Sequence, residues 1–282
     1  MMNPFQDNPA LAGSVECLDL HFGQRAQWAG FEGAPTTSFV NIHGQMTEQG
    51  PNFHGVGGRV ESDEAGPWGH LAVNVAYAYN LKMTSGARLA AGLSAGLYQF
   101  RLNQSMIDLP DVEVANDPAF QGESAFVFPS LDVGLALYER EWFVGLSLIN
   151  ATGASLGNIG AQSEFKRHFA LTANAKMELY RDWSFRPSTQ VRIAPSVPAS
   201  ADLMLALDYN EIAGFGLGYR TGTALLAMAK VKVLDYLSIG YSYGLTTSVM
   251  RAASANSHEV VIGINACGGN SRGRYVSCPA YD

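Results

Sequence analysis

Large apolar residues recur at every second position along much of the chain, with small or polar residues between them. In residues 71–81 one face carries Leu, Val and Tyr, whereas the other carries only Ala and Asn. The same alternation occurs in residues 214–219 and 237–246, where Gly, Ser and Thr occupy the second face. A period of two residues places alternate side chains on opposite faces of a β-strand. The pattern therefore predicts a chain built mainly of strands.

About fourteen segments follow this pattern, and most reach the roughly 9–11 residues that a tilted membrane-spanning strand needs. Their second face holds few of the Lys and Glu residues that cover a soluble protein. A soluble sandwich, with its large residues inside, is the alternative interpretation. Strands in lipid must close into a barrel, because every backbone polar group there needs a hydrogen-bonding partner. We predict an all-β, transmembrane antiparallel β-barrel with strands near residues 17–29, 35–46, 54–62, 68–82, 86–102, 124–138, 141–151, 164–180, 183–195, 200–209, 211–221, 223–234, 236–247 and 257–267.

The connections between these strands alternate in length. If the first strand runs outward, the connections that face the periplasm are mostly short, with residues 49–52 as the exception. The long connections, residues 103–123, 151–163 and 247–256, then all face outward, as in outer-membrane barrels. We therefore expect both termini in the periplasm. The expected organisation is an N-terminal periplasmic segment (1–16), one transmembrane barrel (17–267) and a C-terminal periplasmic tail (268–282).

The composition agrees with a membrane barrel and argues against other classes. Charged residues make up 15% of the chain, against roughly 25% in soluble proteins. The net charge of −7 and the absence of a basic stripe argue against a nucleic acid partner. No apolar run reaches the roughly 20 residues of a spanning helix. No signal peptide is recognisable in the sequence.

Ionisable residues fall on the predicted inward faces, and two interpretations of them remain open. They would line an aqueous channel or substrate path, or they would fill the lumen as paired charges together with inward loops; we favour the second. Both signs occur in similar measure, so no ion selectivity follows. The residues are Asp19, Arg25, Arg59, Glu61, Arg88, Asp132, Lys176, Glu178, Arg186, Arg192, Asp202, Asp208, Lys230 and Lys232.

No constellation predicts an enzyme, a cofactor or a metal site. A hydrolase barrel using Ser94, Ser147 and His168 is conceivable, but sequence separation says nothing about their geometry. The three cysteines lack CxxC spacing, and no histidine has a ligand at close spacing. The glycine-rich residues 92–96 and 214–218 lie on strand faces and are not phosphate loops. We expect them beneath bulky inward neighbours or at strand bends.

Residues 24–46 consist of two extended runs joined by a bend with Gly and Pro at residues 30–35, which predicts a β-hairpin. This stretch resembles the signature hairpin of the PorP/SprF family, outer-membrane proteins of the type IX secretion and gliding motility machinery. Residues 8–14, Asn-Pro-Ala-Leu-Ala-Gly-Ser, resemble the opening of that family. Residues 257–259, Ser-His-Glu, and the later Cys278-Pro279 resemble its close. The resemblance therefore runs along the whole chain. It implies that Met1 lies in an already mature N-terminal segment, so we expect a signal sequence upstream.

The resemblance implies a non-enzymatic component of the bacterial outer membrane. It would serve secretion or cell-surface attachment of cargo proteins that bear a type IX C-terminal signal domain. Its partners would be that domain, other type IX secretion components, outer-membrane lipid and periplasmic peptidoglycan-associated proteins. The chain departs from the family at residues 279–281, where an Arg-Phe pair is expected, which puts a shared role of the tail in doubt. The alternative function is a porin or a hydrophobic-solute transport channel.

Specific sites can also be predicted. We expect cargo to dock on outward loops, through apolar residues with acidic neighbours; the alternative is that the loop after residue 103 folds inward and plugs the barrel. The partner-binding residues are Phe31, Glu32, Met106, Ile107, Leu109, Val112 and Phe120. Barrel closure brings the first and last strands together, which favours a Cys17–Cys278 disulfide with Cys267 as the competing partner. Aromatic residues near strand ends predict an interfacial belt: Trp28, Phe31, Trp68, Trp142, Trp183, Phe185, Tyr236 and Tyr275.

Overall fold

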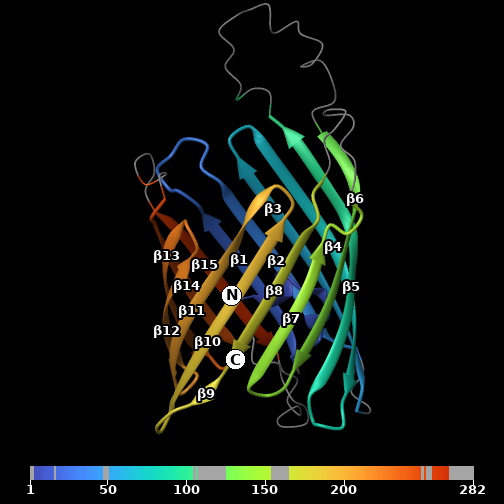
Figure 1. The fold of residues 1–282 in the computed structure, drawn as a ribbon, viewed down its shortest axis with the longest axis vertical. Helices are drawn as coiled ribbons and strands as arrows, with labels where there is room; N and C mark the ends of the chain where they lie inside the picture. Colours follow the sequence, from blue (N-terminus) through green and yellow to red (C-terminus); the bar gives the residue numbers. More distant parts are fainter. Residues whose placement is uncertain are drawn as a thin grey trace, which may run out of the picture.

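The chain folds as a closed antiparallel β-barrel (Figure 1). The computed structural model describes residues 3–15, 17–46, 51–103, 106, 125–153, 165–248, 251 and 256–266. Within these residues, fifteen strand segments form one sheet, and the pairing of β10 with β11 closes the ring. Segments β8 and β9 pair with β10 in the same register, so they are two parts of one strand. The barrel therefore has fourteen strands, as the sequence predicts.

Each strand pairs with its neighbours in sequence, and β1 pairs with β15 across the barrel seam. The bounds are β1 Leu18–Ala26, β2 Thr36–Gln45, β3 Phe53–Ala65, β4 Trp68–Lys82, β5 Arg88–Leu102, β6 Ala125–Tyr138, β7 Trp142–Ile149, β8 His168–Ala175, β9 Met177–Glu178, β10 Trp183–Ala194, β11 Val197–Tyr209, β12 Ala213–Arg220, β13 Ala224–Leu234, β14 Leu237–Thr246 and β15 Ser257–Ala266.

The interruption between β8 and β9 has a local cause in β10. Pairing runs up to Asn174 opposite Ser188 and resumes at Met177 opposite Phe185. Pro187 lies in the unpaired interval, and proline has no backbone N–H to donate to a strand ladder. The sequence predicts one continuous strand here, because hydrophobic alternation in one strand does not reveal a proline in its neighbour.

The outer wall is apolar. The residues predicted to face lipid are all exposed: Val73, Val75, Tyr77, Leu217, Ile239 and Tyr241. Val75 and Leu217 are the most exposed of these residues, at 68% and 66%. The alternate residues Asn74 and Ala76 are buried on the inner face. Among the described residues, the structure has no helix of the length and apolarity needed to span a membrane.

The connections separate by barrel end, as their lengths predict. The turns that follow β4, β6, β11 and β13 are short and lie at one end of the barrel (Figure 1). The connections that follow β5, β7 and β14 are long and lie at the opposite end. The latter is called the long-loop end below.

Residues 3–15, called the lumen segment below, lie inside the barrel. They form two short 3-10 helices, η1 Pro4–Gln6 and η2 Pro9–Leu11. Helix η2 packs against β4, β5 and β6, and its residues are fully buried. One buried cluster joins the lumen segment to the wall: Ala10, Leu11, Ala90, Ala136, Tyr138 and Phe143. The sequence predicts residues 1–16 as a periplasmic segment separate from the barrel, and this packing was not predicted.

Candidate binding site in the barrel lumen

Asn8 anchors the lumen segment to the wall. Its side-chain Nδ2 donates to the carbonyl oxygen of Leu135 on β6 at 3.1 Å. Its Oδ1 accepts from the backbone N–H of Ala10 at 2.9 Å, which caps η2. Pro9 follows at the first helical position, where its missing N–H leaves no intrahelical bond unmade. The Asn-Pro pair thus starts a short helix and ties it to the barrel.

Inward-facing glycines make room for this segment. A Cβ atom on Gly92 would overlap the backbone of Ala10, and one on Gly134 would overlap the Asn8 side chain. Gly13 itself has φ of +69°, a conformation that favours glycine. The glycine-rich stretch in β5 therefore lies beneath inward neighbours, as the sequence predicts.

His43 on β2 holds the end of the lumen segment. The backbone N–H of Gly13 donates to His43 Nδ1 at 3.2 Å. His43 Nε2 lies 3.4 Å from Asp19 Oδ2, and the same oxygen lies 2.9 Å from His21 Nδ1. The Phe5 ring packs on the His43 ring, with centroids 4.6 Å apart. Both ends of the lumen segment are thus attached to the hairpin formed by β1 and β2.

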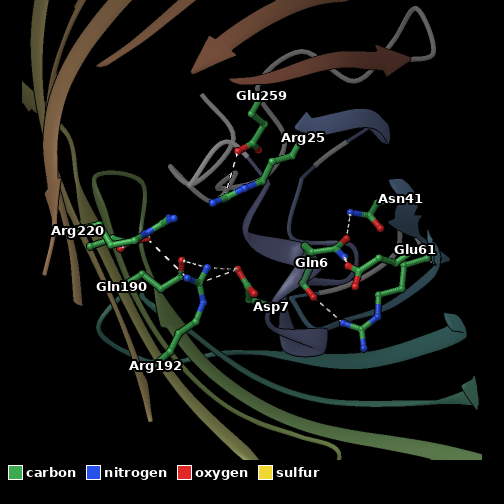
Figure 2. A network of polar contacts seen from close by, with 11 residues as sticks. Gln6, Asp7, Arg25, Asn41, Glu61, Gln190, Arg192, Arg220 and Glu259 are labelled. Atoms are coloured by element: carbon green, nitrogen blue, oxygen red, sulfur yellow. Dashed lines mark hydrogen bonds and ion pairs between the residues drawn. The ribbon is translucent and has the colours of Figure 1, made fainter. Parts of the chain in front are cut away.

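Gln6 and Asp7 extend the segment across the lumen, as Figure 2 shows. Gln6 accepts from Asn41 Nδ2 at 2.6 Å and contacts the Glu61 carboxylate. Asp7 accepts from Gln190 Nε2 on β10 at 2.6 Å. Arg192 Nη2 lies 3.9 Å from the same Asp7 oxygen. The lumen segment therefore bridges β2 and β3 to β10.

Most predicted inward charges are paired. Asp132, whose side chain is fully buried, contacts Arg59 and accepts from the Asn150 N–H at 2.8 Å. Arg186 lies 3.3 Å from Asp208, and Arg220 binds Asp202 through two hydrogen bonds of 2.7 Å. Glu178 and Lys232 lie opposite inner-face residues, Ser184 and Ser238, as predicted, but they are exposed near strand ends. The interpretation of a lumen filled by paired charges describes this barrel better than that of a charge-lined channel.

A cavity of about 470 Å³ remains between the lumen segment and the wall. It is called the lumen cavity below. Its floor includes Asn3, Gln6 and Asp7, and its wall comes mainly from β1, β2 and β10–β15. Its charged residues are Asp7, Arg25, Glu61, Arg192, Asp202, Arg220 and Glu259, and its larger apolar residues are Phe39, Met204, Leu226 and Met228.

Comparison with known proteins decides the family. The family model described as type IX secretion system membrane protein PorP/SprF matches residues 1–264. The chain belongs to the PorP/SprF family. The match includes the lumen segment, the β1–β2 hairpin and the lumen cavity. A comparison with curated protein sequences finds no match.

Solved structures of outer-membrane barrels share the fold of this PorP/SprF protein. The Ralstonia pickettii toluene transporter TbuX is 10% identical, with a TM-score of 0.55 and coverage of 93% of this chain and 92% of that one. The P. putida toluene transporter TodX is also 10% identical, with a TM-score of 0.51 and coverage of 93% of each chain. At this identity the likeness shows the fold alone.

Family and fold are those of a membrane secretion component or channel, and not of an enzyme family. Ser94 and Ser147 are buried on the inner wall, whereas His168 is exposed at the start of β8. Within the described residues, no hydrogen bond joins His168 to either serine. The structure does not assemble the hydrolase arrangement that the sequence left conceivable.

The predicted partner-binding residues are only partly described. Phe31 and Glu32 are exposed in the β1–β2 bend, at the long-loop end, and Met106 is also exposed. The remaining predicted residues, Ile107, Leu109, Val112 and Phe120, lie outside the described residues. Cys17 is disulfide-bonded, and its two candidate partners, Cys267 and Cys278, also lie outside them.

The position of the lumen segment inside the barrel and the lumen cavity were not predicted from the sequence. One signal was available, because several inner-face positions are glycine on neighbouring strands, which leaves space for another segment of chain. Of the aromatic residues predicted for an interfacial belt, Trp68, Trp183 and Tyr236 are exposed at strand ends. Tyr275 lies outside the described residues.

Proposed function

We propose that this PorP/SprF protein is a non-enzymatic outer-membrane anchor. It holds cargo that bears a type IX C-terminal signal domain, for secretion or for attachment at the cell surface. The observation that carries the proposal is the lumen segment, which occupies the interior of a barrel belonging to a secretion family. A barrel occupied in this way serves better as a rigid attachment point than as an open pore.

The contacts of the lumen segment support the proposal that the segment stays bound inside the barrel. Residues Ala10, Leu11 and Ala12 are fully buried, and Asn8 and Gly13 hydrogen-bond to the wall. Removing the segment would expose buried apolar surface and leave a carbonyl and a histidine nitrogen without their partners, which costs free energy. A porin, in contrast, needs a continuous aqueous path. We therefore favour attachment over solute transport.

The proposed cargo surface is at the long-loop end. It comprises Phe31 and Glu32 in the β1–β2 bend and Met106, Ile107, Leu109, Val112 and Phe120 in the connection that follows β5. Apolar residues among acidic neighbours suit a protein interface. In this proposal the long-loop end faces outward and both termini face the periplasm, where peptidoglycan-associated and other type IX components bind. The apolar outer wall contacts outer-membrane lipid.

The test follows a fluorescent protein fused to a type IX C-terminal signal domain. In cells that lack this chain, we expect the fusion to be lost from the surface and to return with the wild-type gene. Deletion of residues 108–120 should weaken retention while the barrel still assembles. Unchanged retention in cells without the chain would refute the proposal.

A conductance measurement separates attachment from transport. The purified barrel in a planar lipid bilayer should pass no measurable ion current. Steady channels in the wild-type protein would favour the porin interpretation instead.

A further inference from the structure

The lumen cavity lies between the lumen segment and the long-loop end. Gln6 and Asp7 form part of its floor. Arg25 and Arg220 line its wall and lie at the ends of β1 and β12. The connections that follow these two strands lie at the long-loop end. A ligand would therefore enter from that end and come to rest on the lumen segment.

Two cross-strand ion pairs in the cavity differ in the distance between their charged groups. Arg220 is directly opposite Asp202, and its Nε and Nη2 each donate to a carboxylate oxygen at 2.7 Å. Arg25 is directly opposite Glu259, yet its Nη1 lies 3.8 Å from the carboxylate. The side chains of Arg25 and Glu259 are 28% and 27% exposed. In the described part of the chain Arg25 makes no hydrogen bond, so its five guanidinium N–H groups remain available to a ligand.

The cavity is lined by charges of both signs, three arginines and four carboxylates. Arg25 contacts Glu259 and Arg192 contacts Asp7, as Figure 2 shows, and Arg192 and Arg220 both contact Asp202. The fourth carboxylate, Glu61, contacts Gln6 and His70. A ligand group of one sign would match only one member of the Arg25–Glu259 pair and would draw it away from the other, which would then lack a partner and cost free energy. The ligand should therefore carry charges of both signs.

An apolar surface adjoins these charges. Met204 on β11 and Leu226 and Met228 on β13 line the same cavity. Methionine side chains are flexible and polarisable, so they adapt to aliphatic groups of different shape. The volume of about 470 Å³ is that of a typical ligand site. The ligand should therefore present an aliphatic group next to its charges.

We infer that the lumen cavity binds an extended peptide segment with one acidic, one basic and one aliphatic side chain. The acidic side chain binds Arg25, the basic one binds Glu259, and the aliphatic one packs on Met228. A peptide backbone also supplies donors and acceptors for the hydroxyl groups of Ser242 and Ser257 in the wall. The inference rests on the proposed function, because a cargo protein is the source of the segment.

The test uses the purified barrel with its disulfide intact, and acetyl-Glu-Leu-Lys-amide as the probe. Calorimetry should detect saturable binding to the wild-type protein. Met228→Trp fills the cavity and should weaken binding by about tenfold or more. Ala229→Trp is the matched control, because Ala229 is exposed on the outer face of the same strand. This variant should bind the peptide as the wild type does.

Three results would overturn the inference. The first is that the wild-type barrel fails to bind the peptide. The second is that Met228→Trp binds the peptide as tightly as the wild type does. The third is that hexanoate or free leucine binds as tightly as the peptide. The last result would indicate a small-molecule site. Cargo retention in cells is measured separately. Peptide binding without cargo retention would refute the proposed function alone, and retention without peptide binding would refute the cavity assignment alone.

Discussion

Gly134 on β6 lies directly beneath the side chain of Asn8, with no space for even one methyl group between them. The relationship explains two features of the sequence together. The inner face needs glycine at this position because Asn8 occupies the space, and Asn8 is held there by its bond to Leu135. The lumen segment and the barrel wall therefore depend on one another.

Replacing Gly134 by Val should displace the lumen segment. The added atoms overlap Asn8, and overpacking of this kind costs about 1–3 kcal/mol. We expect ion conductance to appear in planar bilayers and the N-terminal residues to become sensitive to protease. Gly58→Ala is the control, because a Cβ at Gly58 meets its nearest atom at an ordinary 3.8 Å. A Gly134→Val barrel that conducts no ions and resists protease would show that the lumen segment tolerates the overlap.

The outer face of β4 offers a test of membrane insertion. Val75→Arg should destabilise the barrel by about 2–4 kcal/mol if Val75 lies near the bilayer midplane. Leu81→Arg, one residue from the end of the same strand, should cost only about 0–1 kcal/mol because charge is tolerated near the interface. Urea unfolding in lipid vesicles measures the free energy of unfolding of both variants. Equal losses at the two positions would contradict the predicted depth.

The strand pattern was predictable because it is local. Residues 68–82 form β4 with the predicted bounds, since large and small residues alternate along its whole length. The lumen segment was not predictable in this way. Its thirteen described residues have no periodicity, and its partners, such as His43 and Leu135, are 30 and 127 positions from the residues they bind. The lumen cavity depends on that placement and was missed with it.

The buried pair of Arg59 and Asp132 gives a third prediction. Arg59→Met leaves the Asp132 carboxylate inside the lumen without its guanidinium partner. Removing one member of a buried pair typically costs about 3–5 kcal/mol, because the remaining charge is uncompensated. Adding Asp132→Asn should recover part of the loss, since a neutral amide is cheaper to bury. A double variant no more stable than Arg59→Met would indicate that the pair contributes little.

The stability of the barrel should depend modestly on pH through Glu211, which lies in the turn between β11 and β12. A hydrogen bond from Lys176 lowers the pKa of Glu211 below its ordinary value of about 4.5. A carboxylate with a depressed folded-state pKa stabilises the protein above its unfolded-state pKa, and the contribution disappears as pH falls through the folded-state pKa. The Glu211 side chain is 54% exposed, so solvent screening keeps the effect small.

Glu211→Gln provides the measurement of this effect. Wild type should have the higher melting temperature at neutral pH, and the difference should shrink below the ordinary carboxylate pKa and vanish below the lower folded-state pKa. Asp235→Asn, in the turn between β13 and β14, is the control for simple charge removal. A difference between wild type and Glu211→Gln that persists at low pH would exclude the ion pair as its cause.

The disulfide at Cys17 should join the two strands at the barrel seam. Cys17 directly precedes β1, and Leu18 pairs with Ala266, the last residue of β15. The partner predicted from the sequence is Cys278, whereas this register favours Cys267, the residue that follows Ala266. Closing a loop of this length stabilises the fold by about 5–6 kcal/mol in the chain-entropy model.

Peptide mapping without reduction decides between the two partners. With the partner that the register favours, Cys267→Ser should free the Cys17 thiol and lower the melting temperature, whereas Cys278→Ser should do neither. A peptide that joins Cys17 to Cys278 would instead establish the pairing named from the sequence. A peptide that joins Cys267 to Cys278 would contradict a covalent link across the seam, because that bond would constrain only residues after β15.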